Sequence, residues 1–179
     1  MEQRPASWLP MAVVAMGQTL TTLNISALPV LIGAMVDEFG IAPTMVASTI
    51  VVYSIAVSGF IMLGAKLGQK HGATTVFRWS TALLLLASAL TAFSPNFGML
   101  LAAQGLSGLG AALLLPSLVV LITDNYSGPQ QAKAIGLLGG VQAAATVATI
   151  LIAGTVGTHL GWRYSFGLII PFAVLTWLM

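Results

Sequence analysis

Six long apolar stretches divide the 179-residue sequence, and no charged residue stands in the interior of any of them. They cover residues 8–35, 45–67, 75–93, 97–122, 132–156 and 162–179. A run of about 20 apolar residues can cross the hydrocarbon core of a bilayer as a helix, which satisfies its own backbone hydrogen bonds. The sequence therefore predicts an all-α membrane protein that forms one bundle of six transmembrane helices.

The composition excludes several other classes of protein. Hydrophobic residues make up 58% of the sequence and charged residues only 6%, whereas a soluble domain carries about a quarter charged residues. No basic face is available for nucleic acid. Cysteine is absent, and His71 and His159 have no further ligand at metal spacing. No Ser, His and acidic side chains cluster as a catalytic group. We therefore expect no enzyme, no cofactor and no metal site.

The basic residues predict how the bundle is oriented. Five of them fall in the amino-terminal tail or beside the second and fourth connections, namely Arg4, Lys66, Lys70, Arg78 and Lys133. Only Arg163 falls on the other side, where Asp37 and Glu38 also lie. Because cytoplasmic loops carry the excess of Lys and Arg, both ends of this chain are predicted to be cytoplasmic in an integral plasma (inner) membrane protein.

The sequence also contains a weak internal repeat. The first apolar stretch ends in Pro29 followed eight residues later by Asp37, and the fourth has the same step from Pro116 to Asp124. Arg78-Trp79 likewise opens the third stretch as Arg163-Tyr164 opens the sixth. Since three helices separate the copies, the second enters the membrane from the opposite face, which gives an inverted three-plus-three repeat. Chance similarity between two apolar, Pro-containing helices is the alternative.

Several motifs resemble those of the major facilitator superfamily, particularly its drug:proton antiporter-like branch. Residues 100–117 are similar to its fourth-helix signature, in which Gly105, Gly108 and Gly110 allow close helix packing and Pro116 can bend the helix. Trp162-Arg163, followed by Phe166 and Pro171, is similar to the start of its sixth helix. The resemblance implies that this chain is the amino-terminal half of a longer transporter whose carboxy-terminal half is missing here.

Charged positions of the family pattern are neutral in this sequence. Gln104 stands where the fourth-helix arginine is expected, and Leu20 where the first helix normally has an aspartate. In the fifth helix, Ala153-Gly154 stands at the family's Gly-Gly pair, and Gly154 is a further predicted packing position. If transport is coupled to protons, the ionisable relay would therefore lie in the other half.

The second connection, residues 65–74, is similar to the gating loop of the family. Its matching or substituted positions are Leu67, Gly68, Gln69, Lys70 and Gly72. Gln69 replaces an aspartate, so a charge-assisted contact would become a neutral hydrogen bond and the latch would be weaker. The alternative is a tight cytoplasmic turn with basic residues beside it.

Uncharged polar residues in the first, fourth and fifth helices are the candidates for a substrate cavity. They are Gln18, Thr22, Asn24, Gln104, Ser107 and Gln142. An unpaired amide is costly in hydrocarbon, so these groups should face a wet cavity or one another. Hydrogen bonding between helices is the alternative role.

The resemblance implies a secondary transporter that moves a small organic solute by alternating access, with efflux as the expected direction. Its expected partners are the lipid bilayer, the solute and the missing half, because a half bundle leaves a polar cavity face exposed. A membrane sensor, a scaffold or a transporter relative that has lost its coupling residues is the alternative, suggested by Leu20, Gln69 and Gln104.

Overall fold

The computed structural model describes residues 8–179, and every regular element in that range is a helix. The elements are α1 (Leu9–Phe39), α2 (Pro43–His71), α3 (Ala73–Ala92), α4 (Phe97–Asn125), α5 (Gly128–His159), α6 (Trp162–Gly167) and α7 (Ile169–Leu178). The first five are long and apolar enough to span a membrane, and α6 and α7 together form a shorter apolar segment. Arg4 lies outside the described residues.

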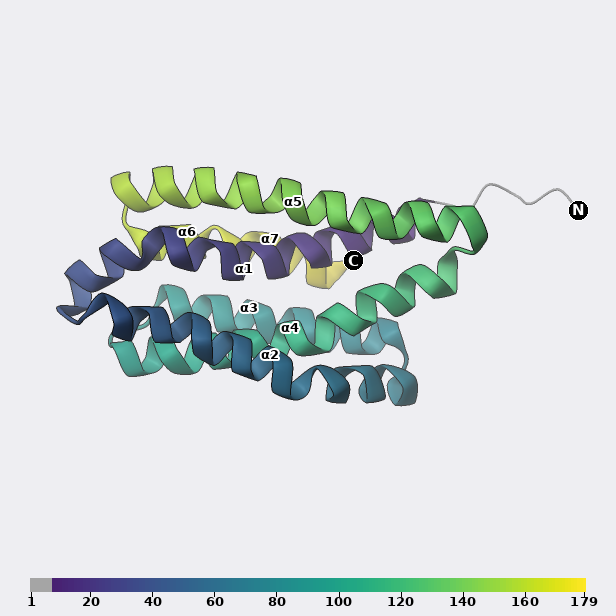
Figure 1. Cartoon of the computed structure of the whole chain (residues 1–179), viewed down its shortest axis with the longest axis horizontal. Helices are drawn as coiled ribbons and strands as arrows, with labels where there is room; N and C mark the ends of the chain where they lie inside the picture. Colours follow the sequence, from purple (N-terminus) through teal and green to yellow (C-terminus); the bar gives the residue numbers. More distant parts are fainter. Residues whose placement is uncertain (1–7) are drawn as a thin grey trace, which may run out of the picture.

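The helices run side by side along the long axis of the molecule (Figure 1). The most extensive contacts join α2 to α4, α3 to α4, and α1 to α5, while α6 and α7 pack against α1 and α3. Helices α2 and α5 do not contact each other and form opposite edges of the bundle (Figure 1). These two edge helices are consequently the least covered by the rest of the chain.

The packing follows the pattern that an inverted repeat produces. If α1–α3 correspond to α4 followed by α5 and the α6–α7 segment, then α2 corresponds to α5 and α1 to α4. Helix α2 packs on α4, and its counterpart α5 packs on α1, so each copy gives its second helix to the first helix of the other. Both first helices also contain an interior proline, Pro29 in α1 and Pro116 in α4.

The helices are longer than the apolar stretches, so several polar residues expected in loops are helical. Asp37 and Glu38 lie in the last turn of α1, which ends at Gly40 with a left-handed φ of 63°. Lys66 and Lys70 lie in α2, Arg78 in α3 and Lys133 in α5, and the two histidines end α2 and α5. Hydrophobicity detects the part of a helix that lies in hydrocarbon, whereas the backbone spiral continues until a capping residue stops it.

The sixth apolar stretch is interrupted, although the sequence predicts a continuous helix over residues 162–179. Helix α6 ends at Gly167 and α7 begins at Ile169. Pro171 has no N–H to offer the carbonyl of Gly167 four residues earlier, so the helical hydrogen-bond ladder is broken at this place. The break lies beside α1 and α5, both of which contact α6.

Glycines on α4 let its neighbours approach closely, as the sequence predicts. A Cβ on Gly108 would overlap the carbonyl oxygen of Tyr53 in α2, and one on Gly110 would lie 2.9 Å from Cγ of Leu84 in α3. Gly105 is less crowded, since its Cβ would be 3.3 Å from a methyl of Val52. Gly154 is the exception, because its Cβ would meet Val30 only at an ordinary 3.7 Å.

Gly64 on α2 is a further contact glycine that the motifs did not single out. A Cβ there would overlap the carbonyl oxygen of Ala112 and lie 2.9 Å from Cα of Leu113. Ala112 is four residues before Pro116, so its carbonyl is the one that the proline leaves without a helical N–H donor. Pro116 and Gly64 therefore act at one place, where a freed carbonyl of α4 lies against bare backbone of α2.

Candidate functional site

Three of the six polar candidates border one small pocket. Gln18, Thr22 and Gln142 line a cavity of about 110 Å³ together with Thr21, Ile25, Tyr53 and Leu115. Four helices contribute to its wall, namely α1, α2, α4 and α5. The Gln18 amide donates to the Thr22 hydroxyl at 3.4 Å, as expected for residues four apart on one helix face. Gln142 lies on the exposed side.

Asn24 and Ser107 lie in a buried hydrogen-bonded group that joins three helices. The Asn24 Oδ1 atom accepts from Ser88 of α3 at 3.0 Å and from Ser107 of α4 at 3.3 Å. Its amide nitrogen donates to the carbonyl of Leu20 at 3.0 Å. Asn24 is 1% exposed and Ser107 is fully buried. In this structure the two side chains are therefore bonded between helices rather than open to a cavity.

Gln104 is also fully buried, and it faces α3. Its amide nitrogen donates to the hydroxyl of Thr91 at 3.1 Å, while its Oε1 atom has no hydrogen-bond partner. Among the described residues no charged side chain forms an ion pair or hydrogen bond with it. A neutral amide thus holds α3 to α4 at the position where the family pattern has an arginine.

The residues of the proposed gating loop are mostly helical. Leu67, Gly68, Gln69 and Lys70 form the last turn of α2, and only Gly72 separates α2 from α3. Gly72 has a φ of 85°, a value that favours glycine, and its N–H donates to the Gly68 carbonyl at 2.9 Å. The side chains of Gln69 and Lys70 are exposed and are not hydrogen-bonded within residues 8–179.

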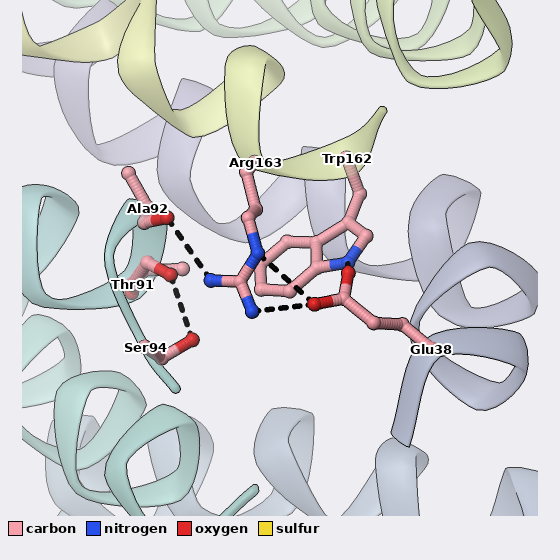
Figure 2. Close-up of polar contacts among 6 residues, drawn as sticks. All are labelled: Glu38, Thr91, Ala92, Ser94, Trp162 and Arg163. Atoms are coloured by element: carbon pink, nitrogen blue, oxygen red, sulfur yellow. Dashed lines mark hydrogen bonds and ion pairs between the residues drawn. The ribbon is translucent and has the colours of Figure 1, made fainter. Parts of the chain in front are cut away.

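A polar clamp at the opposite end of the bundle was not among the predicted site residues. Glu38 Oε1 accepts from Arg163 Nη2 at 2.6 Å and from Nε at 3.1 Å, and Oε2 accepts from the indole of Trp162 at 2.5 Å (Figure 2). Arg163 also donates through Nη1 to the carbonyl of Ala92 at 3.2 Å. The clamp therefore ties the end of α1 to the end of α3 and the start of α6.

The sequence contained a partial signal for this clamp. Trp162-Arg163 was singled out as a motif, and Glu38 was predicted on the same side of the membrane as Arg163. The sequence could not tell which of the neighbouring carboxylates, Asp37 or Glu38, turns toward the arginine. The guanidinium also lies 4.5 Å from the centre of the Trp162 ring, which adds a cation–π contact.

A smaller aromatic cluster joins three helices at the other end. The amide of Met11 donates to the hydroxyl of Tyr126 at 3.2 Å, and the rings of Tyr126 and Trp8 lie 5.4 Å apart. Lys133 Nζ is 5.5 Å from the centre of the Trp8 ring. The start of α1, the end of α4 and the start of α5 are thus held together by contacts of mixed character. Within residues 8–179 no three His, Cys, Asp or Glu side chains are placed to hold a metal ion.

These features define a multi-pass helical membrane bundle with a small polar pocket between its helices. A sequence profile described as the Major Facilitator Superfamily matches residues 14–179, and the chain belongs to this family. Among its relatives, the puromycin resistance protein of Streptomyces alboniger is 27% identical over 96% of this chain and 34% of its own length. The riboflavin transporter RibZ of Clostridioides difficile is 22% identical over 94% of this chain and 37% of its own length.

The fold is also found among solved structures. A crystal structure of the peptide transporter POT in complex with sulfate superposes with a TM-score of 0.83 and 15% identity, covering 94% of this chain and 36% of that one. At this identity the likeness establishes the fold alone. The chain spans about a third of the length of the relatives that it matches. It is an integral multi-pass membrane protein of a transporter family.

Proposed function

We propose that the chain is the amino-terminal bundle of a secondary transporter that moves a small organic solute across the plasma membrane by alternating access. The polar pocket carries the proposal, because four helices place the uncharged side chains of Gln18, Thr22 and Gln142 around one opening. Such groups bind a solute by hydrogen bonds and leave its apolar surface to the other wall residues. The proposed direction is efflux, supported by the puromycin resistance protein among the relatives.

The proposed partner of this bundle is a second bundle of the same polypeptide, packed on the edges formed by α2 and α5. Both helices expose apolar side chains, such as Val51 and Ile55 on α2. On α5, Gly136, Gly139 and Gly140 have open space where a Cβ would stand. Small residues on an uncovered helix face allow another helix to approach closely. The proposed topology places the ends of this bundle in the cytoplasm.

The proposed coupling site lies outside this chain. Every charged side chain among the described residues falls within the terminal turns of a helix, and the polar groups of the helix interiors are neutral. A proton-coupled cycle needs an ionisable group that is exposed in turn to the two sides. We expect transport driven by a pH gradient to stop when the carboxylates within the helices of the second bundle are neutralised. Gradient-driven transport that persists would contradict this assignment.

The direct test of the pocket is transport by the full-length protein in membrane vesicles. Puromycin and riboflavin are the first solutes to measure, since relatives carry their names. Gln18→Leu and Gln142→Leu remove hydrogen-bonding groups from the pocket, whereas Thr155→Val changes an exposed side chain of α5 outside it. We expect about a fivefold or greater loss of transport for each Gln variant, the effect of about one lost hydrogen bond, and normal transport for Thr155→Val.

Equal transport by all three variants would contradict the assignment of the pocket. A correctly assembled protein that neither transports nor binds any solute would favour the alternative of a membrane sensor or scaffold. Gln69→Asp separates a weakened transporter from such a scaffold, because restoring the carboxylate should raise transport only if the latch takes part in a transport cycle.

A further inference from the structure

A second and larger cavity lies between α1, α5, α6 and α7. Its volume is about 310 Å³, and it shares no wall residue with the polar pocket. Its wall is mainly apolar, formed among others by Leu23, Ala27, Ile152, Ala153, Leu168 and Phe172. No charged side chain lines it. Leu168, the residue at which α6 gives way to α7, belongs to this wall, so the helix break helps to shape the cavity.

One polar group of the wall has no hydrogen-bond partner. Ser165 is 5% exposed, and its hydroxyl is not bonded to any atom of the described chain. A serine within a helix commonly donates to the carbonyl four residues earlier. For Ser165 that residue is Gly161, which precedes α6 and whose carbonyl already accepts from the N–H of Tyr164. The start of the helix therefore leaves this buried hydroxyl free at the cavity wall.

The other hydroxyl of the wall is already committed. Thr149 donates to the carbonyl of Ala145 at 2.6 Å, so it can only accept a further hydrogen bond. A buried water molecule needs about two to four polar partners, and this wall offers two at most. A molecule with an apolar body fits better, because it fills the space between the aliphatic side chains and still supplies an acceptor to Ser165.

We propose that this cavity binds an uncharged, mainly apolar organic molecule with one hydrogen-bond acceptor, to which the Ser165 hydroxyl donates. The absence of charged wall residues selects a neutral ligand. Ile152 and Leu168 are half-exposed at the rim on an apolar face, so the ligand comes from the hydrocarbon of the bilayer. The site is separate from the polar pocket, and its occupancy does not depend on whether the protein transports a solute.

Photolabelling with an octanol that carries a diazirine tests this proposal. The probe has an alkyl body and one hydroxyl, and labelled peptides of the full-length protein in vesicles are located by mass spectrometry. We expect adducts on the segments around Ala153 and Ser165 that excess octanol suppresses. Ser165→Ala should reduce this labelling by about fivefold, the effect of one neutral hydrogen bond. Ala153→Leu should reduce it further by filling the cavity.

Ser117→Ala is the matched control. Ser117 is a buried serine of α4 that donates to the carbonyl of Leu113 at 2.9 Å and lies outside the cavity wall. Its variant should be labelled like the unchanged protein. Labelling that Ser165→Ala leaves unchanged would overturn the proposal. Adducts spread over all exposed helix faces and insensitive to excess octanol would overturn it as well, since they would report only partition into lipid.

Discussion

At the scale of single residues, Glu38 makes the most concentrated set of polar contacts in the described chain. Both of its carboxylate oxygens are used, one by the Arg163 guanidinium and one by the Trp162 indole. The side chains of Arg163 and Glu38 keep 31% and 42% of their surface exposed, so solvent screens the pair. Its main effect is geometric, because it fixes where α1, α3 and α6 meet.

We predict that Glu38→Gln destabilises the protein more than Asp37→Asn. The amide keeps one acceptor, but its NH₂ group would face either the Trp162 N–H or the guanidinium, so one charge-assisted bond becomes a contact between two donors. The expected loss is about 1 kcal/mol after allowance for solvent screening. Thermal unfolding in detergent measures it.

Asp37→Asn is the matched control for this prediction. Asp37 is the neighbouring carboxylate, and it forms no hydrogen bond or ion pair within residues 8–179. The control removes the same charge from the same helix end. Equal midpoints for Glu38→Gln and the unchanged protein would show that the clamp is not stabilising.

Asn24 and Ser107 provide a second test at this scale. Asn24→Leu and Ser107→Ala each break the bond between α1 and α4. Polar contacts between membrane helices contribute about 0.6 kcal/mol on average, so the two substitutions together should destabilise less than their sum by about that amount. A double-mutant cycle in unfolding free energy gives the coupling. Strict additivity would mean that this hydrogen bond contributes nothing.

At the scale of the helices, the contact between α2 and α4 depends on missing side chains. The backbones approach at Gly108 and again at Gly64, where Pro116 has freed the carbonyl of Ala112. A methyl group at either glycine would overlap a backbone oxygen, which cannot move away as a flexible side chain would. The helix pair therefore has little freedom to adjust.

We predict that Gly108→Ala destabilises the bundle by about 1–3 kcal/mol, the usual range for overpacking. Gly33→Ala in α1 is the control, because its new methyl group meets no atom within 4 Å. It should be neutral or slightly stabilising, since alanine is the better helix former. Resistance to unfolding in detergent, followed by size-exclusion chromatography, compares the two variants. Similar stability for both would contradict the close approach.

The elements differ in how well the sequence predicts them. Hydrocarbon admits only helices or closed barrels, so the apolar stretches predict the spans directly. The helix ends depend on single residues such as Gly40 and Gly72, which hydropathy does not detect. The break at Leu168 was predictable in principle from Pro171, whose missing N–H interrupts the ladder. Which neighbour a buried amide faces depends on tertiary packing, so the bond from Gln104 to Thr91 could not be read from one helix.

At the scale of the whole molecule, the bundle is fixed differently at its two ends. The clamp of Glu38 and Arg163 holds one end, and the aromatic cluster around Tyr126 holds the other. Lys66, Lys70, Arg78 and Lys133 all lie toward the end opposite Arg163 (Figure 1). This asymmetry of charge supports the proposed orientation with the connections at Gly72 and Ser127 in the cytoplasm.

Labelling of single cysteines in intact cells tests the account most directly, because this chain contains no cysteine of its own. Exposed positions are available at both ends of the bundle, and any cysteines in the rest of the protein would be replaced. We predict that an impermeant maleimide labels Phe93→Cys and Leu160→Cys from outside, and labels Gln69→Cys and Ser127→Cys only after permeabilisation. Labelling of Gln69→Cys from outside, or of all four positions alike, would contradict a six-helix bundle with both ends in the cytoplasm.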